Sequence, residues 1–141
     1  MHPTYKSVNS FLVASIPEFR PRYDEEIQKR GRRPGPYIVF GVLNSMVVEA
    51  LDFDGDASFL DNAFEIFEKM ALSGDLEVVN LLQVGFVQDL VRYPRRLATA
   101  WQLMGPQTQK ITMATATAWN REMNLPIAAR KERAKAKAQG R

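Results

Sequence analysis

Carboxylates are the side chains of this 141-residue chain whose number and spacing could support chemistry. The segment from Glu49 to Asp89 contains ten acidic residues and a single basic one, Lys69. Acidic pairs can hydrolyse sugars, acidic clusters can bind metal ions, and acidic surfaces can bind basic partners. Six of the ten form the candidate site: Asp52, Asp54, Asp56, Asp61, Glu65 and Glu68.

The first three of these residues alternate in the way that the ligands opening an EF-hand calcium loop do. Counted from Asp52, the sixth position is Ala57, where that loop needs glycine for its sharp turn. The twelfth position is Ala63, where the loop needs a bidentate glutamate. We therefore interpret the segment as an acidic loop whose charges favour the positive end of the helix that follows.

The last three acids recur at helical spacing, as carboxylate ligands in di-metal helical bundles do. Such bundles also need histidines, and His2 is the only histidine of the chain. There is no cysteine, and neither a Ser-His nor a Cys-His nucleophile can be assembled. Sugar hydrolysis needs two carboxylates that face each other across a cleft. A hydrolase function would therefore require a buried pair of carboxylates with strongly shifted pKa values. We expect no enzymatic activity, no metal and no cofactor.

The distribution of charge favours binding instead. The chain carries +3 and the residues from Arg130 onward carry +5, so the preceding residues carry −2. Apolar residues between the acids recur at helical spacing, which should turn the acids outward. We expect this acidic surface to bind a basic protein partner, because complementary charge increases association rate and specificity. The alternative interpretation is that water alone solvates these charges.

Helices are the elements expected to position this surface. The apolar spacing predicts about six helices, packed as antiparallel hairpins in a compact all-α stack. We expect them near 7–16, 37–51, 58–72, 75–90, 95–104 and 107–123, with a short polar helix around 23–29. A strand at 37–40 is the alternative for the start of the second. The expected domain organisation is a single helical domain at 1–124 and a basic, flexible tail at 125–141.

Turn and capping residues give finer expectations. Ser58 should cap the helix at 58–72, and its core face should contain the buried apolar residues of that stretch, Phe64 and Phe67 among them. Gly74 should adopt the left-handed conformation after this helix, and Asp75 should cap the next one. Gly85 is expected to permit the close approach of a neighbouring helix.

The N-terminal apolar run at 11–14 is too short for a secretion signal and far too short to span a bilayer. The chain also lacks the cysteines of a disulfide framework. We therefore expect a cytoplasmic protein with no membrane partner.

Several short segments in a fixed order carry a family resemblance. They are Ile16-Pro17-Glu18-Phe19, Tyr23, Pro36-Tyr37, Phe40-Gly41, Leu43, Phe67-Glu68-Lys69-Met70, Ser73-Gly74-Asp75, Val79-Asn80-Leu81, Val84-Gly85-Phe86, Asp89-Leu90 and Gly105-Pro106-Gln107-Thr108. In this order they resemble an uncharacterised bacterial family of small all-helical proteins of the kind associated with polymorphic-toxin immunity. Asp89 stands where the pattern has glutamate, and the chain after Met123 lies outside the resemblance. The resemblance implies a cytoplasmic binding protein without catalytic residues, of the kind that inhibits a cognate toxin domain.

A second function class rests on basic residues. Arg30, Arg32 and Arg33 form a basic loop, and the bases from Arg130 to Arg141 could join it in binding nucleic acid. Such binding would weaken steeply as salt increases and would be lost when the tail is deleted.

Overall fold

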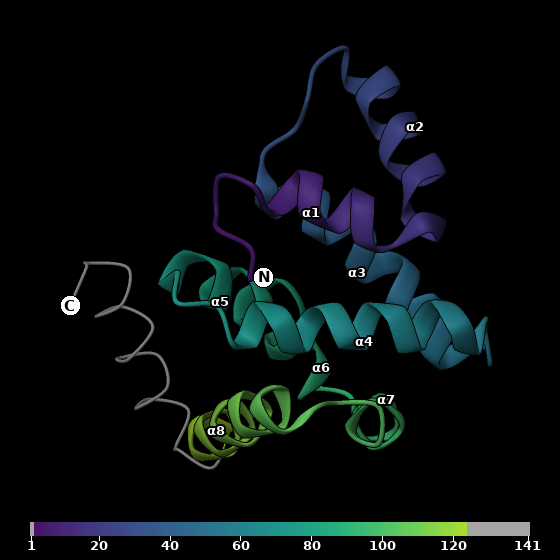
Figure 1. Ribbon diagram of the computed structural model, residues 1–141. Coiled ribbons are helices and arrows are strands. Elements are labelled where there is room, and N and C mark those ends of the chain that lie inside the picture. Colours follow the sequence, from purple (N-terminus) through teal and green to yellow (C-terminus); the bar gives the residue numbers. More distant parts are fainter. Residues whose placement is uncertain (1, 124–141) are drawn as a thin grey trace.

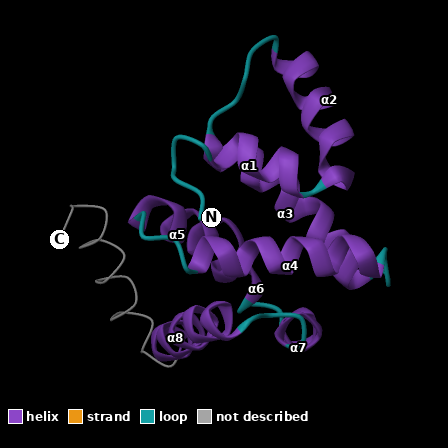
Figure 2. Ribbon diagram, in the orientation of Figure 1, coloured by secondary structure: helices purple, strands orange, loops and turns teal. Residues whose placement is uncertain are grey.

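The regular structure of the described residues is entirely helical. The computed structural model describes residues 2–123 and contains no strand in that range (Figure 2). Its elements are α1 (Val8–Ser15), the 3-10 turn η1 (Pro17–Phe19), α2 (Arg20–Arg30), α3 (Pro36–Asp52), α4 (Ala57–Ala71), α5 (Leu76–Leu82), the π-helical segment η2 (Gln83–Val87), α6 (Gln88–Leu90), α7 (Pro94–Trp101) and α8 (Pro106–Met123). The all-α prediction is confirmed, with seven helices in residues 2–123 if α5, η2 and α6 are counted as the one continuous helix they form. The predicted basic tail lies outside the described residues.

Helix α4 occupies the middle of the fold. Figure 1 shows α1 and α2 on one side of it and α7 and α8 on the other. Contacts connect α4 to α1, α3, α5 and α8. The arrangement follows from its sequence, because eight of its fifteen residues are buried and therefore face neighbours on several sides.

Four phenylalanines form the centre of the core. Phe40, Phe64, Phe67 and Phe86 are all buried, and the centroids of neighbouring rings lie 4.7 to 5.7 Å apart. The predicted burial of Phe64 and Phe67 is confirmed. The rings meet at tilted and edge-on angles, which aromatic side chains prefer over stacked sandwiches.

The predicted close approach at Gly85 is also confirmed. A Cβ atom at this position would lie 2.5 Å from Cδ1 of Phe40. Gly85 lies in the π-helical segment, so α3 packs against the backbone where the continuous helix changes its register.

Two local expectations were wrong. The residue that caps α4 is Asp56, because its Oδ1 accepts hydrogen bonds from the backbone N–H groups of Ser58 at 2.9 Å and Phe59 at 3.4 Å. Gly74 does not adopt the left-handed conformation; among the glycines of the described residues, Gly31 alone does so, at the end of α2.

The turn between α4 and α5 is held by side chains instead. Ser73 donates a hydrogen bond from its hydroxyl to the carbonyl of Pro3 at 2.7 Å and accepts one from the N–H of Asp75 at 3.1 Å. The predicted capping role of Asp75 is confirmed by a 3.0 Å bond from the N–H of Glu77. Its second oxygen accepts a hydrogen bond from the N–H of Tyr5 at 2.7 Å, so the N-terminal segment also stabilises this turn.

We predict that replacing Asp56 with alanine lowers the free energy of unfolding by about 1 kcal/mol, because α4 loses its capping acceptor. Replacing Ser58 with alanine should change it by less than about 0.5 kcal/mol, because its side chain makes no capping bond. Urea denaturation of the two variants measures both values. A larger loss for the serine variant would contradict this assignment of the cap.

Candidate functional site

The six carboxylates predicted to bind a partner all lie on α3, α4 and the loop between them. Asp52 ends α3, Asp54 lies in the loop and Asp56 caps α4. Asp61, Glu65 and Glu68 follow along α4, within about 60° of helical arc of one another. The structure nevertheless gives these six residues different environments.

Asp52 is bound within the protein by an arginine from α7. Arg96 donates from Nε to Oδ1 of Asp52 at 3.0 Å and from Nη2 to Oδ2 at 2.7 Å. The Arg96 side chain is 15% exposed, lies 4.4 Å from the centre of the Tyr93 ring and reaches to 3.7 Å from Asp89. The hydrogen bond from Arg96 lowers the pKa of Asp52; burial raises it, and the arginine's charge lowers it further, to a net decrease. Asp52 therefore joins α3 to α7.

Glu68 is also used within the fold. Its Oε2 accepts the N–H of Gln107 at 2.9 Å, and its Oε1 accepts both the N–H and the hydroxyl of Thr108 at 2.8 Å. Burial raises the pKa of Glu68, but the three bonds from Gln107 and Thr108 lower it by more, so the net shift is downward. Glu68 is the N-terminal cap of α8, supplied from another helix.

The remaining predicted residues are more available for contact with a partner. Asp54 and Asp61 are exposed and form no ion pair or side-chain hydrogen bond with the described residues. Glu65 is 68% exposed and lies 4.0 Å from Lys69, a distance at which an exposed ion pair contributes little. Asp56 is exposed and caps α4. The partner-binding role of all six residues stays a prediction.

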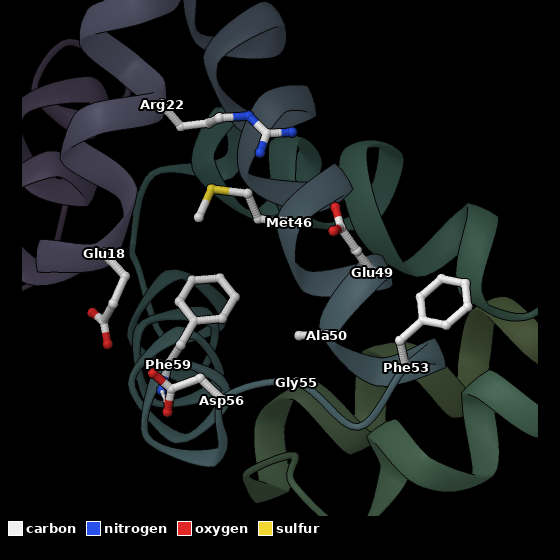
Figure 3. Close-up of a pocket in the computed structure, with 9 residues that line it drawn as sticks. All are labelled: Glu18, Arg22, Met46, Glu49, Ala50, Phe53, Gly55, Asp56 and Phe59. Carbon is white, nitrogen blue, oxygen red and sulfur yellow. Dashed lines mark hydrogen bonds between the residues drawn. The ribbon is translucent and has the colours of Figure 1, made fainter.

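A pocket of about 400 Å³ lies beside this surface, between η1 and α2, the second half of α3, and the loop that leads into α4 (Figure 3). Three carboxylates and one arginine line it, together with an apolar floor. The residues that matter for its chemistry are Glu18, Arg22, Met46, Glu49, Asp56 and Phe59. Glu18 was not predicted as a site residue, because only the folded chain brings it to the same pocket as residues of α3.

The described side chains include no group of three or more acidic or histidine residues placed to hold a metal ion. In the same part of the chain, no helix is both long and apolar enough to cross a membrane.

Comparison with known proteins identifies a family for most of the chain. The model of a family described as "Domain of unknown function (DUF7674)" matches residues 9–120. No curated protein matches the chain, and no solved structure does. The match agrees with the resemblance to an uncharacterised family, but nothing in it links the family to toxin immunity.

Proposed function

The chain belongs to the DUF7674 family, whose function is unknown, and on this premise we propose that it is a non-enzymatic binding protein for a basic protein partner. The partner would contact the acidic corner, which we define as the carboxylates at and beside the turn from α3 to α4. These are Glu18, Glu49, Asp54, Asp56, Asp61 and Glu65.

The observation that carries this proposal is the imbalance of charge at the acidic corner. From Glu49 to Glu65 the chain has six acids and no base, and within the described part of the chain only Asp52 among them is paired with an arginine. Like charges held together in this way repel each other, and an arginine- or lysine-rich surface would offset that repulsion. Asp54 is one of the exposed acids of this turn, and its backbone adopts a positive φ of 49° there.

The narrower form of the proposal is an immunity protein that neutralises a cognate bacterial toxin by covering its active site. Its support is the family resemblance together with the acidic corner. A toxin that acts on nucleic acid needs basic residues to bind phosphates, and an acidic inhibitor would compete for those residues.

Charge reversal on α4 tests the proposal. Glu68 must stay, because it caps α8. We expect wild-type protein to capture a basic partner from cells that make the chain, and the double variant Asp61→Lys, Glu65→Lys to bind the purified partner about a hundredfold more weakly. The matched control is Asp24→Lys, Glu25→Lys, which makes the same charge change on exposed residues of α2. Equal binding by both double variants would remove the electrostatic mechanism.

The second candidate function is nucleic-acid binding. Arg32 and Arg33 are exposed and form no ion pair among the described residues, whereas Arg30 is held by Glu26 at 2.7 Å. The C-terminal bases that would join them lie outside the described residues. A gel shift that weakens with salt and disappears when Arg130 to Arg141 are deleted would favour this function over the first.

A further inference from the structure

We propose that the pocket beside the acidic corner binds one arginine side chain of the basic protein partner. The inference rests on the proposed function and deepens it, because it assigns a defined ligand to one place on the surface. It also assigns binding roles to Glu18 and Glu49, which line the pocket.

The lining of the pocket matches both halves of an arginine side chain. Met46 and Phe59 offer apolar contacts for the aliphatic stem, and in Figure 3 they lie between Glu18 on one side and Glu49 on the other. With Asp56 included, the lining carries three negative charges and the single positive charge of Arg22. A cationic head group is therefore the complementary ligand.

Glu18 supplies an independent indication of a missing donor. Its Oε1 is buried from solvent and has no hydrogen-bond partner among the described residues. A buried acceptor without a partner is unfavourable, and a charged N–H donor is the group that satisfies a carboxylate best. Because Glu18 lines the pocket, a rotation of its carboxylate group would bring this oxygen to a guanidinium bound there, which would provide that donor.

The spread of the carboxylates favours a guanidinium over smaller cations. They do not converge to the spacing that a metal ion needs. A guanidinium presents five N–H donors in a plane, so it can reach carboxylates on different sides, whereas a lysine ammonium is a compact point charge. Phe53 is 79% exposed at the edge of the pocket, where its ring could cover the guanidinium plane.

Substitution of Arg22 allows a test whose expected result, stronger binding, cannot arise from loss of folding. It is exposed, lines the pocket and forms no ion pair among the described residues. Its positive charge should repel an incoming guanidinium. Removing that charge should therefore strengthen binding of the ligand, whereas a damaged fold could only weaken it.

The experiment is a titration of the full chain, labelled with ¹⁵N, with N-acetylarginine methylamide. We expect saturable shifts at the backbone amides of Ala50, Gly55 and Phe59, and none with the norleucine analogue, which lacks the guanidinium. Glu18→Gln and Glu49→Gln should each weaken binding about tenfold, since each removes a charge-assisted hydrogen bond. Arg22→Gln should strengthen it about twofold or more. Glu77→Gln, an exposed acid on α5, is the matched control and should leave binding unchanged.

Absence of saturable shifts at the pocket, or equal affinity in wild type, Glu18→Gln and Glu49→Gln, would overturn the inference. In that case partner binding that still depends on Asp61 and Glu65 would leave the proposed function intact. Conversely, arginine binding at the pocket together with partner binding that ignores the charge reversals on α4 would leave the arginine site but remove the electrostatic mechanism of the proposed function.

Discussion

Replacing Glu68 with alanine is expected to lower the free energy of unfolding by about 2 to 3 kcal/mol. The change removes the acceptor of three hydrogen bonds and leaves the fully buried Thr108 hydroxyl without this partner. It also removes a negative charge from the positive end of α8, which has no acidic residue in its own first turn. Urea denaturation at neutral pH measures the loss.

Glu65→Ala is the matched control for this prediction. Glu65 lies on the same helix, is largely exposed and contacts only Lys69 at 4.0 Å. Its loss should change the free energy of unfolding by less than about 0.5 kcal/mol. If both variants lost the same stability, Glu68 would not be the cap of α8.

The same bond network fixes the sign of a pH dependence. In the folded protein the pKa of Glu68 lies below its ordinary value of 4.5. Its contribution to stability is therefore fully present above the unfolded pKa and is lost as the pH falls through the folded one. The difference in stability between wild type and Glu68→Gln should be largest at neutral pH and should shrink below about pH 4.5. A difference that grew in acid would contradict the assignment.

Exchanging two glycines for alanine should have effects of opposite sign. Gly85→Ala is expected to lower the free energy of unfolding by about 2 kcal/mol, because the new Cβ would lie 2.5 Å from the Phe40 ring. That ring cannot easily move, since it is fully buried and packs 5.7 Å from Phe67. Denaturation by urea or heat would show the loss despite the better helix propensity of alanine.

Gly41→Ala is the control. Gly41 lies in α3, is exposed, and has no atom within 4 Å of the position that a Cβ would take. Alanine there should raise the free energy of unfolding by about 0.5 to 1 kcal/mol, because it is the better helix former. Stabilisation by both substitutions would show that the contact between Gly85 and Phe40 is looser than described.

The helices could be predicted because the spacing of apolar residues that marks them is local in the sequence. The spacing of Phe64 and Phe67 in α4 marks a buried face from the sequence alone, and continuous apolar residues predicted α3. The cap of α4 was misassigned by two residues, because Asp56 and Ser58 are both good capping residues and only the backbone conformation decides between them.

The contacts of individual acidic residues could not be predicted, because their partners are distant in the chain. Asp52 and Arg96 are 44 positions apart, and Glu68 and Thr108 are 40 apart. One signal was available: α8 begins after Gly105, which has no side chain to cap it, so its first N–H groups were open to an acceptor from another helix. Nothing local indicated that Glu18 would share a pocket with Glu49.

Hydrogen exchange of the purified complex with its basic partner tests the central claim most directly, because it shows which surface the partner covers. We predict slower exchange in η1, in the second half of α3, in the loop at 53–56 and in the first turns of α4. Protection confined to the basic loop at 30–33, with exchange at the acidic corner unchanged, would contradict it.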